Sequence, residues 1–321
     1  MRQKLHLDAI KIRPHGALSN DCDGKKMFLR FLPWIGLAYM GVAWGLGFSI
    51  AKVATASGTT PIGLAFWSSM ISGIMLLGYA FIRGRPLIWT KASVYLYLIV
   101  ALIGFVIPST CFYFAASHLQ AGVLSITVTL VPILTYALAL LLRTERFSSI
   151  RLVGIIMGTV AIFLLIGPEN SLPGNGALPW VLLACLSSLC YAVENIYLAR
   201  RGINDVGAIR LACGMHLFAA IILAPTGLLI DGKILLDVSN WKLTSSIVLL
   251  AFINATAYAA FVACIASSGP LFASQVGYVV TLAGVLWGIA IFGETHSMWV
   301  WASLVTMLVG LMLVSPRKQY T

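Results

Sequence analysis

The sequence predicts an all-α integral membrane protein with ten transmembrane helices in two inverted five-helix repeats, with its N- and C-termini cytoplasmic. Three observations give this prediction. Of the 321 residues, 60% are hydrophobic and only 10% are charged, whereas about a quarter of an ordinary soluble domain is charged. Ten apolar runs follow one another, each close to the roughly 20 residues needed to cross a bilayer. The chain also contains an internal repeat.

The apolar runs are continuous rather than alternating, so helices are predicted instead of a β-barrel. Residues 1–33 are polar, basic and interrupted by proline and glycine, which predicts a disordered basic cytoplasmic tail without a cleavable signal peptide. The first five-helix repeat is expected over residues 34–167, the second over residues 178–315, and a cytoplasmic tail over residues 316–321. The ten spans are expected at about 34–54, 61–82, 93–116, 120–142, 149–167, 178–199, 206–230, 243–266, 271–292 and 297–315.

The positive charges predict the orientation of the spans. With the N-terminus inside, 18 of the 21 Lys and Arg residues fall on the cytoplasmic side, and only Lys52, Lys233 and Lys242 fall on the other. Because positively charged loops resist translocation, both termini are expected inside a multi-pass protein of the inner (plasma) membrane. This topology accounts for the formal net charge of +11, so no nucleic-acid partner is expected.

Two stretches of the chain, residues 115–154 and 265–303, resemble each other. Glu145 follows Pro132 by 13 residues in the first stretch, and Glu294 ends the matching helix of the second. A repeat of five spans is odd, so the second copy must be inserted upside down. Inverted repeats are typical of secondary transporters, whose substrate site lies near the middle of the membrane between the halves.

The chain therefore resembles the drug/metabolite transporter superfamily, in particular its exporters with EamA domains. The similarity covers about residues 34–315 and rests on the family's opening helix and on the ends of its two units, here Trp44, Gly45, Phe48 and Lys52, then Pro132, Glu145 and Glu294. It implies a ten-helix exporter of amino acids or related metabolites. Thr281 stands where the second half usually has a proline, so the two halves are not expected to be equally mobile.

Glu194 is the strongest candidate for a transport residue. It lies six residues before Arg200, which places it roughly 9 Å inside the cytoplasmic end of its span at 1.5 Å per residue. An ionisable side chain at this depth is costly and usually faces a cavity or a partner. Glu194 could bind a substrate ammonium group or carry a proton. The alternative is an ion pair with Arg201 or Arg210.

Other polar and aromatic side chains inside the spans either hold helices together or line a cavity. Prolines inside the spans can kink a helix and free backbone carbonyls, so Pro108, Pro132 and Pro225 are candidate hinges. The predicted substrate-binding residues are Glu194, Asn195, Tyr191, Trp44, Phe48, Asn254, Tyr258, Gln275 and Tyr278.

Several further residues have a structural explanation. Lys52 can extend to the membrane interface, or it can be the counter-ion of a substrate carboxylate. Glu145 and Glu294 are expected to meet the free amides of the helix that follows each of them. The G-x-x-x-G pairs at 41–45 and 154–158 allow close helix approach, within the monomer or in a possible homodimer.

The sequence predicts no enzyme, no cofactor and no metal site. It contains no H-E-x-x-H pair, no C-x-x-C pair, no pair of close carboxylates within the spans and no phosphate-binding G-x-x-x-x-G-K-[ST] pattern. The predicted function is a secondary active exporter of small neutral or zwitterionic metabolites such as amino acids, driven by a proton gradient or by exchange. An intramembrane enzyme and a membrane assembly protein without transport activity remain alternatives.

Overall fold

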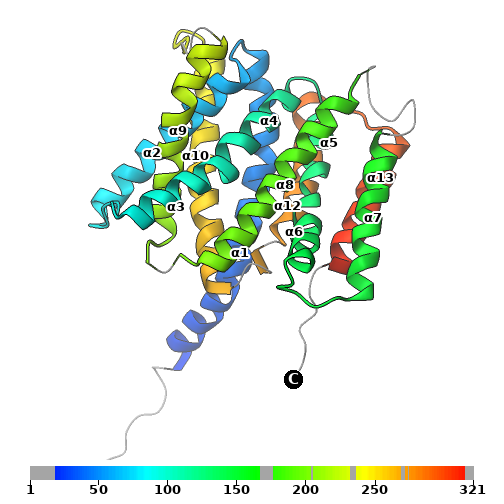
Figure 1. Ribbon diagram of the computed structural model, residues 1–321, viewed down its shortest axis with the longest axis horizontal. Coiled ribbons are helices and arrows are strands. Elements are labelled where there is room, and N and C mark those ends of the chain that lie inside the picture. The colour runs from blue at the N-terminus through cyan, green and yellow to red at the C-terminus, as the bar shows by residue number, and fades with distance from the viewer. Residues whose placement is uncertain are drawn as a thin grey trace, which may run out of the picture.

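The computed structural model describes residues 19–166, 176–203, 205–231, 236–268, 272–273 and 275–314, and the regular elements in these ranges are helices (Figure 1). Eight helical spans are long and apolar enough to cross a membrane, and two shorter apolar helices follow them. The prediction of an all-helical membrane protein with ten spans is confirmed. In chain order the helices are α1 (Ser19–Ala56), α2 (Pro61–Ile82), α3 (Lys91–Ala101), the π-helix η1 (Leu102–Val106), α4 (Ile107–Ala116), α5 (Ala121–Val128), α6 (Leu130–Leu141), α7 (Ser149–Ile166), α8 (Leu178–Arg201), α9 (Ala208–Asp231), α10 (Trp241–Ser268), α12 (Val276–Phe292) and α13 (Met298–Val314).

The first helix begins earlier than the sequence predicted. α1 starts at Ser19, so residues 19–33 are helical, whereas a disordered tail was expected there. The segment 27–32 reads MFLRFL, and a run this apolar can continue a membrane helix toward the interface. The remainder of the predicted tail, residues 1–18, and the predicted C-terminal tail, residues 316–321, lie outside the described residues.

The two halves pack as two copies of one unit. α1 packs against α10 and α12, and its counterpart α8 packs against α4 and α6; likewise α2 packs against α10, and its counterpart α9 packs against α3. Three pairs of counterparts also contact each other, namely α2 with α9, α5 with α12, and α7 with α13. Exchanging the halves maps these contacts onto one another, as a pseudo-twofold axis requires.

Because the number of spans is even, the chain enters the first span and leaves the last span at the same side of the bundle. The first residues of α1 and the last residues of α13 lie at the same side of the bundle in Figure 1. We call this the terminal side and the opposite one the far side. The pair α7 and α13 stands at one edge of the molecule (Figure 1), with the other helices grouped beside it.

Two prolines coincide with breaks in the regular α-helix. Proline has no N–H and its ring clashes with the carbonyl four residues earlier. The π-helix Leu102–Val106 lies directly before Pro108, and Thr129 separates α5 from α6 just before Pro132. These two predicted hinges therefore lie where the backbone hydrogen bonding is irregular, and whether they move stays a prediction.

The α-helix is not broken at the third predicted hinge, nor at the position in the second half that corresponds to Pro132. Pro225 lies inside α9, which continues as one α-helix from Ala208 to Asp231. Thr281 occupies the position in α12 that Pro132 occupies in the first half, and α12 is unbroken from Val276 to Phe292. A residue with an N–H keeps the ladder intact, so this difference between the halves follows from the sequence.

The glycine pairs serve contacts within the chain. A Cβ at Gly41 or Gly45 would overlap residues of α12, and a Cβ at Gly154 would overlap the backbone and side chains of α13. A Cβ at Gly158 would overlap Ile133 of α6. These glycines therefore allow close packing of α1 on α12 and of α7 on its neighbours.

Candidate functional site

A cavity of about 170 Å³ lies between the two halves. Its wall is drawn from the middle stretches of α1, α8, α9, α10 and α12 and from the irregular regions around Pro108 and Pro132. Most of the lining is apolar or aromatic, as in most small-molecule sites. The aromatic side chains are Trp44, Phe48, Phe105, Phe112, Tyr113, Tyr191, Tyr258 and Phe261.

Seven of the nine substrate-binding residues predicted from the sequence line this cavity. The other two, Gln275 and Tyr278, are not among its lining residues, whereas Val276, Gly277 and Val280 of the same segment are. The segment borders the cavity, but it presents a different face to it than the one that contains Gln275 and Tyr278. The seven that line it are Glu194, Asn195, Tyr191, Trp44, Phe48, Asn254 and Tyr258.

Glu194 is the acidic side chain of the cavity wall. It is 2% exposed, and its Oε1 accepts a hydrogen bond from the Tyr258 hydroxyl at 2.5 Å. Gly104 of the π-helix lies against the carboxyl group, and a Cβ at that position would overlap it. A π-helical segment is often found at functional sites, and here its glycine makes room for a buried carboxyl group.

The ion pairs considered for Glu194 from the sequence are wrong. Arg201 binds Asp205 through two hydrogen bonds of 2.7 and 3.3 Å. This contact lowers the pKa of the exposed Asp205 carboxyl below its ordinary value. Arg210 donates from Nε to the backbone carbonyl of Pro86 at 2.8 Å. Both arginines are therefore engaged elsewhere, and among the described residues Glu194 forms no ion pair.

Two further polar side chains, His216 and Asn254, belong to the cavity wall. His216 is fully buried and its ring lies edge-on to Phe105, with the ring centroids 4.9 Å apart. His216 was not selected from the sequence, because a lone histidine on an apolar helix carries no spacing signal that links it to Glu194.

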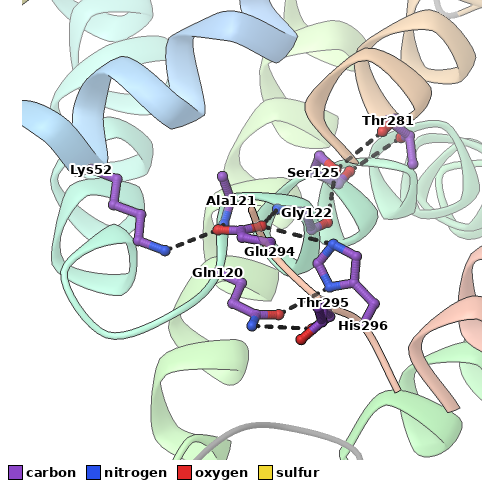
Figure 2. A network of polar contacts seen from close by, with 9 residues as sticks. All are labelled: Lys52, Gln120, Ala121, Gly122, Ser125, Thr281, Glu294, Thr295 and His296. Atoms are coloured by element: carbon purple, nitrogen blue, oxygen red, sulfur yellow. Dashed lines mark hydrogen bonds and ion pairs between the residues drawn. The ribbon is translucent and has the colours of Figure 1, made fainter. Parts of the chain in front are cut away.

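A polar cluster joins the two halves at the far side of the bundle (Figure 2). Glu294, which follows α12, directs its carboxylate at the first amides of α5. Oε1 accepts from Ala121 N at 2.8 Å and from Lys52 Nζ at 2.9 Å, while Oε2 accepts from Gly122 N at 3.1 Å. A carboxylate at a helix N-terminus satisfies free N–H groups and interacts favourably with the helix dipole.

This arrangement corrects two expectations. Glu294 meets helix amides as expected, but they belong to α5 in the other half and not to the helix that follows it. Lys52 has a carboxylate partner inside the protein, so neither extension to the interface nor a free counter-ion for a substrate describes it. α1, α5 and the end of α12 are thereby tied together on the far side.

The chain around Glu294 positions its carboxylate. α12 ends at Phe292, and Gly293 adopts a left-handed conformation with φ of 63°, which glycine reaches without a steric penalty. Ser125 and Thr281 then exchange hydrogen bonds, each hydroxyl donating to the other residue's carbonyl at 3.1 Å (Figure 2). These bonds hold α5 beside α12, so the amides of α5 stay within reach of Glu294.

The corresponding position in the first half is different. Glu145 pairs with Arg151 at 3.2 Å, and its side chain is 53% exposed. Both partners lie in the same half, and within the described residues the Glu145 carboxylate accepts from the Arg151 side chain and not from a helix amide. The expectation that Glu145 meets the amides of the following helix is therefore not met. Among the described residues a glutamate joins the halves at the far side, whereas at the terminal side Arg200 donates to the Leu142 carbonyl at 3.5 Å and Arg210 to that of Pro86.

Comparison with known proteins is consistent with this fold. The model of the EamA-like transporter family matches residues 32–167 and 178–315. A WAT1-related protein of Arabidopsis thaliana, At3g02690, chloroplastic, is 26% identical over 196 residues, which is 58% of this chain and 45% of that protein. The match thus spans less than half of that relative.

One solved structure, described as "Crystal structure of protein", is also similar. It has a TM-score of 0.62 and 18% sequence identity, over 86% of this chain and 95% of that one. At this identity the likeness shows the fold alone.

Proposed function

Since this chain belongs to the EamA-like transporter family, we propose that it is a secondary active exporter of small neutral or zwitterionic metabolites, amino acids among them. The observation that carries the proposal is the aromatic cavity between two pseudo-symmetric halves, with the buried Glu194 in its wall. A site at this place is what inverted-repeat transporters use. The distribution of Lys and Arg favours the inner (plasma) membrane with the terminal side in the cytoplasm.

The Lys52–Glu294 cluster is proposed to close the far side of the path in this state. Opening that side requires the Glu294 carboxylate to leave the amides of Ala121 and Gly122 and the ammonium group of Lys52. On the terminal side Glu145 pairs with Arg151 of its own half. Two related halves that are joined by different contacts at the two ends support alternating access, in which the halves exchange these roles.

The driving force is proposed to be a proton gradient or exchange. The sequence has no nucleotide-binding pattern that would support ATP drive. Glu194 is the carboxyl group of the cavity wall, hydrogen-bonded to Tyr258 and unpaired with any described Lys or Arg. It can therefore exchange a proton or a substrate ammonium group without breaking a salt bridge.

The test is flux in proteoliposomes with purified protein, after a thermal-shift screen of amino acids, nucleosides and vitamins has identified ligands. Glu194→Gln is expected to abolish transport or uncouple it from the proton gradient, measured at two pH values. The control is Glu145→Gln, which makes the same chemical change at an exposed glutamate and should leave coupling intact. Wild-type rates and coupling in Glu194→Gln would remove Glu194 from the mechanism, and the absence of any solute flux would overturn the proposed function.

A further inference from the structure

A groove on the outer surface of the bundle lies between α2, the start of α9 and α10. Its volume is about 850 Å³. We propose that this groove binds one anionic phospholipid of the terminal-side leaflet, with an acyl chain along α10 and the phosphate between Arg85 and Arg210. The inference goes beyond the proposed function, because it does not depend on which solute the protein carries.

The apolar wall of the groove has the depth of one leaflet. On α10 it extends from Phe252 to Ala263, which is about 16 Å along the helix axis at 1.5 Å per residue. Half of a hydrocarbon core of about 30 Å is about 15 Å. Small side chains on this face of α10 leave the space that a chain would fill, and they are Ala255, Ala259, Ala260 and Ala263.

α10 separates this groove from the solute cavity. Asn254 and Tyr258 lie on its cavity face, whereas Phe252, Thr256 and Ala259 lie on its groove face. Residues three or four apart share one face of a helix, so the two sites are distinct. The Phe252 side chain is 46% exposed, and the groove therefore opens toward the bilayer.

Positive charge gathers at one end of the groove. Because the spans alternate in direction, α2 ends and α9 begins at the terminal side, where Arg85 and Arg210 line the groove. Neither arginine forms an ion pair with a described acidic residue. Asp205 also lines this end, but Arg201 binds its carboxylate through two hydrogen bonds. The end of the groove therefore keeps an excess of positive charge.

A hydrogen bond brings the two arginines to one place. Nε of Arg210 donates to the carbonyl of Pro86 at 2.8 Å, and Pro86 follows Arg85 directly in the chain. This bond uses one of the five N–H donors of the guanidinium group, whose planar fork matches a phosphate. Arg85 belongs to the first half and Arg210 to the second, so a phosphate bound by both would join the halves at the terminal side.

An anionic phospholipid satisfies both parts of the groove. Basic pockets between membrane helices bind anionic headgroups, and each Arg near the surface strengthens binding about fivefold. A second copy of this chain could cover the apolar wall, but the chain has a formal net charge of +11 and does not complement the arginines. The charge therefore favours a lipid over a self-contact.

Two lipids with the same acyl chains test the headgroup. Delipidated protein in detergent is titrated with dioleoyl phosphatidylglycerol, which is anionic, and with dioleoyl phosphatidylcholine, which is zwitterionic, and bound lipid is measured by native mass spectrometry. The wild type should bind one phosphatidylglycerol at least about tenfold more tightly than phosphatidylcholine, since two arginines act on its charge.

The double variant Arg85→Gln/Arg210→Gln should remove this preference. The matched control is Arg143→Gln/Arg146→Gln, which makes the same charge change at two exposed arginines of the terminal side outside the groove lining; it should keep the preference. Equal affinities of the wild type for the two lipids, or a preference that survives the loss of Arg85 and Arg210, would overturn the proposal.

A second pair of variants tests the acyl chain. Ala259→Phe fills the apolar part of the groove and should weaken both lipids by similar factors of about fivefold or more. Ala263→Phe, at an exposed position one turn further, should do the same and serves if the first variant does not fold. Val248→Phe, on an exposed part of α10 outside the groove, should leave both affinities unchanged.

Unchanged binding of both lipids in folded Ala259→Phe and Ala263→Phe would place the lipid elsewhere and overturn the assignment. Native mass spectrometry also reports dimers, and a dimer of the wild type that disappears in Ala259→Phe would assign the groove to a second copy and overturn it equally. None of these measurements uses flux, so a failure of the proposed transport function would leave the lipid site standing.

Discussion

The substitution Glu294→Gln tests most directly whether the Lys52–Glu294 cluster closes the far side. The substitution keeps the size of the side chain but removes its charge and one of its two acceptor oxygens. In the structure three donors converge on this carboxylate, from Lys52, Ala121 and Gly122, at 2.8–3.1 Å. In the variant the glutamine NH₂ group faces one of these donors, so the closed far side should be weakened.

The magnitude follows from these bonds. A hydrogen bond to a charged group contributes about 1.5–3 kcal/mol and a neutral one about 0.5–1.5 kcal/mol, so three bonds lose roughly 3 kcal/mol in total. The Lys52 side chain is 29% exposed, and water replaces part of its contribution. A net cost of about 2 kcal/mol increases the population with an open far side about 30-fold, at 1.4 kcal/mol per factor of ten.

Accessibility of a cavity cysteine measures this population. Ala116 ends α4 at the far side and lines the cavity. Ala116→Cys, in a background without the six native cysteines, can be labelled with a membrane-impermeant maleimide from the far side. When opening is fast compared with labelling, the rate follows the open population, so Glu294→Gln should raise it more than tenfold.

Glu145→Gln is the control, because Glu145 is exposed and pairs within its own half; it should leave the far-side rate unchanged. If folded Glu294→Gln protein were labelled at the wild-type rate, the idea that this cluster closes the far side would be refuted. A lower rate would contradict the reasoning equally.

Two further predictions concern glycines. Gly104→Ala places a methyl group on the Glu194 carboxyl, so ligand binding measured by thermal shift should weaken at least about tenfold, whereas wild-type affinity would show that the π-helix does not shape the site. Gly45→Leu forces α1 away from Ala283 of α12 and should lower the free energy of unfolding by about 1–3 kcal/mol. Gly78→Leu, where a Cβ meets nothing within 4 Å, should leave the unfolding temperature unchanged, and equal effects at the two glycines would contradict the close-packing explanation.

The number of spans, their approximate limits and the two related halves could be read from the sequence. Helix length in a membrane is set by the bilayer, and a run of apolar residues is a local property that needs no knowledge of neighbours. The burial of Glu194 could also be predicted from the sequence, because an acidic side chain deep inside an apolar span is unfavourable where it faces lipid. The break before Pro132 and the continuous helix through Thr281 followed from the missing or present N–H.

The tertiary structure alone decided which face of each helix meets the cavity. Lipid and protein interior are both apolar, so a membrane helix has no strong hydrophobic face to mark its rotation. For this reason Gln275 and Tyr278 were selected where Val276 and Gly277 line the wall, and His216 was missed.

Contacts between residues distant in sequence were equally hidden. Glu294 binds amides more than 170 positions earlier in the chain, and no local spacing encodes that partner. The sequence determined that the chain spans a membrane as two five-helix halves because solvent and charge act on each segment separately. Only the packing of those halves decided which buried polar groups share a cavity, because that depends on the rotation of every helix at once.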